Sequence, residues 1–277
     1  MTAPDVDFEV EYNNRARVPE HPAHMAAWVR DAAAWRGAQQ GRWRVIRYGS
    51  GARHTIDFFP ARDEGPIVVF IHGGYWQALD PSSFSHLAAG LHAHGIDVAM
   101  PSYDLCPEVS VADIIAQMQR ATRELARLGR PLVMSGHSAG GHLAACMMAT
   151  DWRKLDPSLP QDLITKTYAI SGLFDLRPLV QTSLNRALRL DQASADASSP
   201  VLWPAPSHGV LDAVVGERES AEYHRQSRQM AERWGGCSGI ATRYESIAGT
   251  DHFTVIAPLA DPHSAMTQRL KQLAALS

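Results

Sequence analysis

The pentapeptide Gly136-His137-Ser138-Ala139-Gly140 is the stretch of this chain with the clearest chemical potential. It follows an apolar run typical of a buried strand and precedes a run with helical composition, so Ser138 is predicted on a strand-to-helix turn. Small residues on both sides allow the backbone to turn that sharply. The amino-terminal end of the following helix directs positive partial charge toward the serine. We therefore predict Ser138 as a catalytic nucleophile.

A serine hydroxyl needs a base to take its proton, and the base needs a carboxylate to orient it. His252, in AGTDHFTVI, lies between the last predicted strand and the final predicted helix, and we predict it as the base. Three acids after the seventh strand compete for the orienting role. We favour Glu219, with Glu217 second, because Glu222 already falls within a helical pattern. Asp175, after the sixth strand, is a more distant alternative.

Acyl transfer also requires donors for the oxygen that becomes negative in the tetrahedral intermediate. Each backbone N–H aimed at that oxygen lowers the barrier by about 3 kcal/mol. The sequence HGGYW follows a predicted strand, and Gly73 and Gly74 let that backbone approach the reacting carbonyl without an intervening Cβ. We predict an oxyanion hole formed by the N–H groups of Gly73, Gly74 and Ala139.

These residues must be brought together by a sheet whose strands end at one edge. Short β-rich runs alternate with helical patterns along most of the chain, which predicts an α/β fold with a mostly parallel, eight-stranded sheet and helices on both faces. The first two runs, joined by GSGA, predict a hairpin. The predicted strands are Arg42–Tyr48, His54–Phe59, Ile67–Ile71, Ile96–Met100, Pro131–Gly136, Thr165–Ser171, Gly209–Gly216 and Ile240–Ile247.

Helical patterns fill most of the intervals between these runs. The segment 110–129 has a Ser at the expected N-cap, an Asp three residues later and a terminal Gly, and a last helix is predicted over roughly Thr254–Ala275. Two segments interrupt the alternation. Residues 1–40 contain a helical pattern before any strand, and residues 172–207 combine short helical patterns with a Ser/Pro-rich loop. We expect one domain over 1–277, with both segments forming a small cap over the ligand-binding end of the sheet.

Composition excludes several other classes of protein. The chain has 277 residues, is 45% hydrophobic and 20% charged, and has a formal net charge of −3, with no basic stretch that would indicate nucleic-acid binding. Three scattered cysteines argue against a disulfide framework and for a reducing, cytoplasmic setting. We find no signal-peptide pattern, no membrane-spanning run and no metal-binding spacing such as HExxH. A small-molecule substrate with no cofactor or metal is expected, and a homodimer is compatible with the sequence.

The chain resembles the hormone-sensitive-lipase-like branch of the α/β-hydrolases, through HGG and GHSAGG, and more specifically the serine-type arylformamidases, or kynurenine formamidases. The second resemblance rests on FIHGGYW, YDLCPEV, GHSAGGHLAA, ISGLFDLRPL, SLNRALRLD, ERESAEYHRQS, DHFTVI and the YNNRARVPEH start, and it covers nearly the whole chain. The order nucleophile, acid, histidine is that of the fold family. An Asp is usual at the acid position of the family, so Glu219 is a departure.

The resemblance implies hydrolysis of N-formyl-kynurenine to kynurenine and formate. Its leaving group is aromatic, so Tyr75 and Trp76 are predicted to flank it by stacking, although Trp76 could instead pack in the core beneath the N-terminal segment. A general carboxylesterase with the same triad is the alternative function. A non-catalytic, ligand-binding hydrolase relative is a third reading, which would require a missing catalytic member, and the sequence lacks none.

Overall fold

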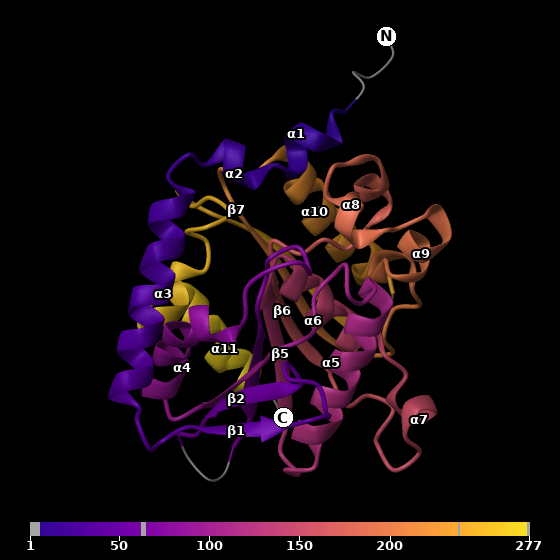
Figure 1. The fold of residues 1–277 in the computed structure, drawn as a ribbon. Coiled ribbons are helices and arrows are strands. Elements are labelled where there is room, and N and C mark those ends of the chain that lie inside the picture. Colours follow the sequence, from indigo (N-terminus) through magenta and orange to yellow (C-terminus); the bar gives the residue numbers. More distant parts are fainter. Residues whose placement is uncertain (1–5, 62–64, 238, 276–277) are drawn as a thin grey trace.

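The computed structural model describes residues 6–61, 65–237 and 239–275, and its described strands form one twisted sheet of eight strands (Figure 1). The strand order is β1-β2-β4-β3-β5-β6-β7-β8. β1 and β2 form the predicted hairpin, β2 is antiparallel to β4, and the remaining neighbours are parallel. The strands are β1 (Arg44–Arg47), β2 (Thr55–Phe59), β3 (Ile67–Ile71), β4 (Asp97–Pro101), β5 (Leu132–His137), β6 (Lys166–Ile170), β7 (Gly209–Gly216) and β8 (Ile240–Ile247).

Strand β3 shows why the central runs of the sequence are continuously apolar. All five of its residues are buried, and they alternate between two hydrophobic cores. Ile67, Val69 and Ile71 face the core on one side of the sheet, while Val68 and Phe70 face the core on the other. A strand buried on both faces cannot show the polar–apolar alternation of an exposed sheet. The predicted α/β fold with a mostly parallel sheet is confirmed.

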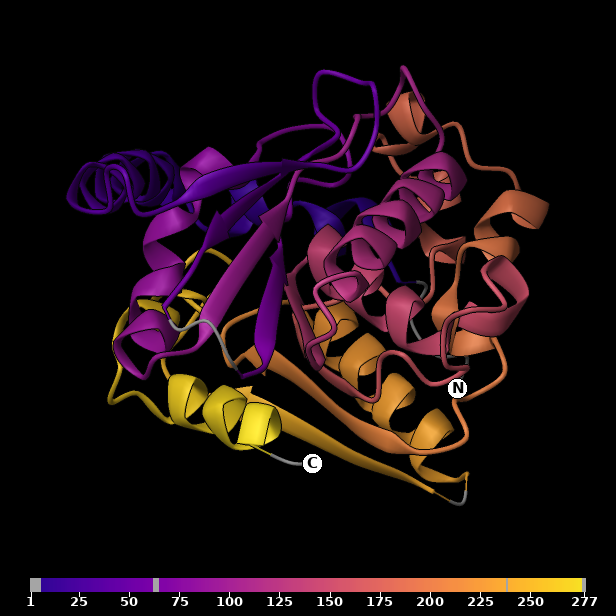
Figure 2. The same cartoon turned by 90° about the horizontal axis from the view of Figure 1, so that it is seen from below.

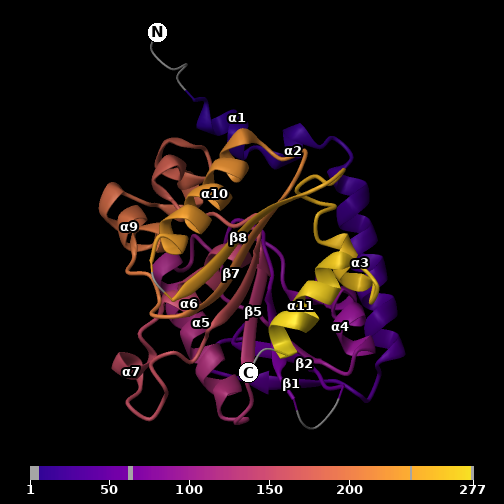
Figure 3. The same ribbon diagram turned by 180° about the vertical axis from the view of Figure 1, so that it is seen from behind.

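Helices cover both faces of this sheet, as Figure 2 shows in a view along its layers. Helices α3, α4 and α11 lie over one face, and α5, α6 and α10 lie over the other, as also seen from behind in Figure 3. The α-helices are α1 (Phe8–Tyr12), α2 (Asn14–Arg17), α3 (His21–Ala38), α4 (Ala89–Ala93), α5 (Val111–Ala126), α6 (Ala139–Ala149), α7 (Trp152–Leu155), α8 (Asn185–Leu188), α9 (Gln192–Ala197), α10 (Ala221–Gly235) and α11 (Ala265–Ala275).

The sequence predicted the start of helix α5 correctly and the start of helix α11 wrongly. Helix α5 begins after Ser110, which forms the predicted capping box with Asp113. The predicted last helix was wrong in its start, because α11 begins at Ala265 rather than near residue 254. Pro258 and Pro262 lie in the interval, which contains only a short 3-10 helix. Proline lacks the N–H that a helix interior requires, so the apolar pattern there does not continue as one helix.

The two segments that interrupt the alternation lie close to each other. Helices α1 and α2 pass over the end of the sheet near α10, and α1 contacts both α10 and the 3-10 helix Arg177–Gln181 of the 172–207 segment (Figure 1). The Glu9 carboxylate accepts two bonds from Ser183, from its backbone N–H and its hydroxyl, each at 2.6 Å. In the described ranges, no helix is long and apolar enough to cross a membrane.

Candidate active site

Ser138 occupies the strained turn between β5 and α6. Its backbone has φ +57° and ψ −118°, a conformation that few non-glycine residues adopt and that is found mostly at functional sites. The flanking glycines are sterically required. A Cβ on Gly136 would lie 2.3 Å from the Gly140 carbonyl oxygen, and a Cβ on Gly140 would lie 1.9 Å from the Ile71 carbonyl oxygen. The turn can therefore pack against the end of β3 only with glycine at these positions.

His252 and Glu219 lie together at the same edge of the sheet. His252 Nδ1 is 2.6 Å from Glu219 Oε2, and both side chains are buried. The other carboxylate oxygen accepts bonds from the Ser171 hydroxyl at 2.5 Å and the Gly216 N–H at 2.6 Å. A carboxylate held this way fixes the ring and keeps the proton on Nδ1, which leaves Nε2 as the basic nitrogen. His252 and Ser138 line the same cavity.

The other acids considered for the orienting role bond to groups other than His252. Glu217 is exposed, and its Oε2 accepts a bond from the Gly249 N–H at 2.6 Å. Glu222 is buried in α10, where its carboxylate accepts bonds from the Tyr12 hydroxyl at 2.7 Å and from Arg225. Asp175 is paired with Arg177 in a two-bond ion pair. Of the acids weighed from sequence, Glu219 is the one within hydrogen-bond distance of His252.

The loop after β3 packs closely against the serine turn. A Cβ on Gly73 would lie 3.1 Å from the Ser138 Cβ and 2.9 Å from the His137 carbonyl oxygen. Gly74 has φ +109°, and a Cβ there would lie 2.3 Å from the Ala78 carbonyl oxygen. Across the described residues, no recorded hydrogen bond uses the N–H of either glycine, and Ala139 is the first residue of α6, whose N–H has no acceptor within the helix. These donors are free to meet an oxyanion above Ser138.

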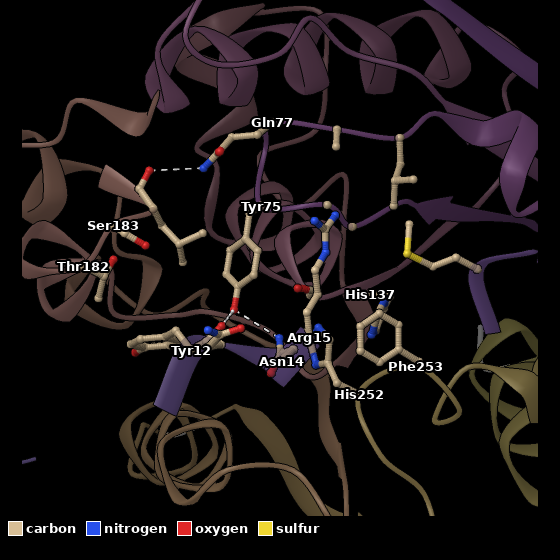
Figure 4. A pocket seen from close by; sticks show the side chains of 18 of the residues that line it. Tyr12, Asn14, Arg15, Tyr75, Gln77, His137, Thr182, Ser183, His252 and Phe253 are labelled. Atoms are coloured by element: carbon tan, nitrogen blue, oxygen red, sulfur yellow. Dashed lines mark hydrogen bonds between the residues drawn. The ribbon is translucent and has the colours of Figure 1, made fainter. Parts of the chain in front are cut away.

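A cavity of about 270 Å³ opens above these residues (Figure 4). One wall is apolar and mostly aromatic, with contributions from α3, the loop after β3 and the loop after β8. The opposite wall comes from α1, α2 and the 172–207 segment. The first wall contains Met25, Trp28, Leu79, Phe84 and Phe253, and the second contains Glu9, Tyr12, Asn13, Asn14, Arg15, Thr182, Ser183 and Leu184.

The two predicted aromatic contacts differ in position. Tyr75 lines the cavity, and its hydroxyl donates to the Tyr12 carbonyl at 2.6 Å and accepts a bond from the Asn14 amide at 3.1 Å (Figure 4). Trp76 has no exposed surface and is absent from the cavity lining. It packs edge-on against His142 with ring centroids 5.0 Å apart. The structure thus brings Tyr75 to the cavity and keeps Trp76 in the core, the alternative allowed from sequence.

Tyr223 of α10 joins the two sides of the site, although the sequence gave no reason to single it out. Its ring lies 4.7 Å from the His252 ring, and its hydroxyl is 2.7 Å from that of Tyr75 and 2.9 Å from the Asn14 amide nitrogen. Tyr223 lies in the first turn of the helix that follows β7, a helix that the sequence pattern predicted. Its partners Tyr75 and Asn14 are far away in the sequence, so the pattern could not indicate these contacts.

Burial keeps several titratable groups around the serine uncharged. Burial lowers the pKa of His137 well below the usual value for histidine, and it raises the pKa of Tyr75 well above the usual value for tyrosine. The His137 ring lies 4.7 Å from the His252 ring. His137 is therefore a neutral imidazole and Tyr75 a protonated phenol at neutral pH. The cavity floor beside His252 and Ser138 consequently carries little charge of its own.

A mostly parallel sheet with a serine on a strand–turn–helix elbow, followed along the chain by a carboxylate–histidine pair, defines the α/β-hydrolase class. The chain belongs to the alpha/beta hydrolase fold family, whose model matches residues 68–255. It is therefore a hydrolase, as predicted.

Individual relatives sharpen this assignment. The kynurenine formamidase of Salmo salar is 28% identical over 263 residues, which cover 91% of this chain and 88% of that protein, and confirms the resemblance read from the sequence. The crystal structure of a candidate thioesterase from Silicibacter sp. TM1040 is 36% identical, with a TM-score of 0.84, and the match covers 95% of this chain and 98% of that one. An esterase of Pyrobaculum calidifontis, 17% identical with a TM-score of 0.69 and covering 99% and 95% of the two chains, shares the fold.

Proposed function

We propose that this protein is a serine hydrolase that cleaves an aryl formamide, with N-formyl-kynurenine as the leading substrate. The observation that carries the proposal is the small, aromatic-walled cavity directly above Ser138 and His252. Its size, about 270 Å³, lies just below the range of about 300–1,000 Å³ usual for small-ligand sites and suits a compact aromatic molecule. The likeness to kynurenine formamidases over most of the chain supports the same substrate.

In the proposed acylation step, the Ser138 oxygen attacks the formyl carbon while His252 Nε2 takes the hydroxyl proton. Glu219 stabilises the imidazolium through the bond to Nδ1. The formyl oxygen becomes an oxyanion and accepts bonds from the N–H groups of Gly73, Gly74 and Ala139. When the C–N bond breaks, His252 returns the proton to the aniline nitrogen, and the amine leaves.

The second half of the reaction repeats the first with water as the nucleophile. His252 takes a proton from water, the resulting hydroxide attacks the formyl ester, and the Ser138 oxygen leaves with that proton. The products are formate and the free enzyme. A formyl group is the smallest acyl group, so the close packing of Gly73 against Ser138 does not obstruct this chemistry.

Hydrolysis of a small ester is the second candidate function. The likeness to the candidate thioesterase of Silicibacter favours it, because the same nucleophile and oxyanion donors can act on esters and thioesters as well as on amides.

The two candidates are separated by comparing kcat/KM on N-formyl-kynurenine with kcat/KM on para-nitrophenyl acetate, para-nitrophenyl butyrate and a short acyl thioester. We expect the formamide to be the best substrate. Preference for the longer acyl ester, with no turnover of the formamide, would refute the formamidase proposal and leave the esterase.

A further inference from the structure

Arg15 lies in the cavity wall without a protein partner. Arg15 belongs to the short helix α2 and is exposed. Figure 4 shows its side chain extended into the cavity. Over the described residues, no ion pair or hydrogen bond of the Arg15 guanidinium is recorded. Arg17, two residues later, differs in this respect because it pairs with Glu11 at 3.5 Å.

No carboxylate near the site pairs with this cation within the described residues. Glu9 also lines the cavity and stays ionised, because the bonds from Ser183 and the charge of Arg186 lower its pKa, but its oxygens bond to Ser183 and form no ion pair with Arg15. Glu219 lies behind the His252 ring and is held by its own three bonds. Burial leaves His137 and Tyr75 neutral, as described above.

The segment that carries Arg15 is held in place by bonds to distant parts of the chain. The neighbouring Asn14 amide donates to the hydroxyls of Tyr75 and Tyr223, and the Tyr12 hydroxyl donates to Glu222. Arg15 therefore extends from a backbone that is already ordered, so a ligand that binds its side chain does not also have to order the helix. A guanidinium presented this way matches a carboxylate, which it binds through two parallel hydrogen bonds.

We propose that Arg15 binds a carboxylate on the leaving group of the substrate and makes the enzyme selective for aryl substrates that bear this carboxylate. The proposal rests on the proposed function, since it assigns the end of the substrate opposite the reacting carbonyl. The substrate class is an aryl formamide whose ring bears a carboxylate-containing side chain, as an aromatic amino-acid derivative does. Arg15 is a specificity residue in this scheme and takes no part in bond making.

The test compares matched substrates in Arg15→Gln, which removes the charge at similar length. The desamino analogue of N-formyl-kynurenine, 4-(2-formamidophenyl)-4-oxobutanoate, carries the carboxylate without the ammonium, and ortho-formamidoacetophenone keeps the aryl formamide and lacks the carboxylate. We expect KM for the anionic substrate to rise about 10- to 100-fold, the usual effect of losing a charge-assisted bond, with kcat within about threefold. Turnover of the neutral substrate should be unchanged. Arg15→Lys should recover part of the loss.

Arg17→Gln is the matched control, because Arg17 lies on the same helix and outside the cavity lining. It should leave the ratio of the two kcat/KM values unchanged. Equal losses on the anionic and neutral substrates in Arg15→Gln, or no loss on either, would overturn the proposal. Loss of the same ratio in the control would overturn it as well.

A second substrate pair keeps this test independent of the formamidase proposal. If neither formamide is hydrolysed, para-acetoxybenzoate and its methyl ester give the same comparison with ester chemistry. A selective loss on the anionic ester in Arg15→Gln would support the carboxylate site even though the formamidase proposal had failed. Selective loss only on mono-para-nitrophenyl succinate, whose carboxylate is on the acyl side, would overturn the assignment to the leaving group.

Discussion

The edge of the sheet that carries Ser138, Glu219 and His252 is built differently from the cover formed by α1, α2 and residues 172–207. Each of those three residues lies within five residues after the end of a strand. A strained turn places Ser138, the Gly216 N–H and the Ser171 hydroxyl hold Glu219, and Glu219 holds His252. The cover is held instead by side-chain bonds between segments far apart in the chain, such as Tyr12 to Glu222 and Glu9 to Ser183. In the proposed mechanism the edge supplies the reacting groups, and the cover lines the cavity through which a substrate would reach them.

Removing the nucleophile gives the largest expected effect and affects only the edge. Ser138→Ala should lower kcat/KM by about 10⁵-fold or more, as loss of a serine nucleophile does in other triads. The thermal unfolding midpoint should stay close to that of the wild type, because the Ala side chain fits the turn. Turnover at more than about a hundredth of the wild-type rate would show that Ser138 is not the nucleophile.

Glu219→Gln should have the next largest effect, about 10³- to 10⁴-fold on kcat. The new amide would donate to Nδ1 and force the unproductive tautomer of His252, while Ser171 and Gly216 keep the side chain in place. Glu217→Gln is the control, because Glu217 is exposed and bonds to Gly249, and it should change kcat less than about threefold. The reverse ranking would identify Glu217 as the acid.

A pH-dependent loss of stability is expected where the edge meets the cover. His142 of α6 donates to the Ser198 carbonyl at 2.7 Å, and burial lowers the pKa of His142 to about 4 from 6.5. The unfolded chain therefore takes up this proton first as the pH falls. The contribution is complete above pH 6.5 and is lost between there and about pH 4, amounting to about 3 kcal/mol.

Denaturant unfolding of the wild type and His142→Gln at several pH values measures this difference. The free energy of unfolding of the variant should fall less steeply below pH 6.5. Parallel curves over that range would show that His142 is not the group responsible.

The smallest effect is expected from breaking the contact within the cover. Glu9→Gln and Ser183→Ala should each raise KM a few-fold, in line with about 1 kcal/mol for an exposed hydrogen bond, and leave kcat unchanged. The double variant should add little to Glu9→Gln, because Ser183→Ala removes only the hydroxyl bond to Glu9 and leaves the backbone N–H bond in place. Hydrogen exchange of residues 6–17 should increase in step. A fall in kcat without a change in KM would place this contact in the chemistry and remove the contrast with the edge.

The sequence was sufficient for most of the fold and for the edge of the site. Strand β3 was recognisable because a run buried on both faces must be apolar. Strand β5 was recognisable because the turn at its end requires Gly136 and Gly140. Position relative to strand ends singled out His252 among thirteen histidines. The start of α11 was missed because Pro258 and Pro262 break an otherwise suitable apolar pattern.

The sequence by itself determined the parallel sheet, the serine turn and the order of the candidate triad, since these depend on local patterns and on the rule that parallel strands end at one edge. Only the tertiary structure decided that Glu219 rather than Glu217 faces His252, that Trp76 is in the core, and that Arg15 points into the cavity. These features depend on side-chain directions and on contacts between residues that lie from 33 to 210 positions apart in the chain, which no local pattern encodes.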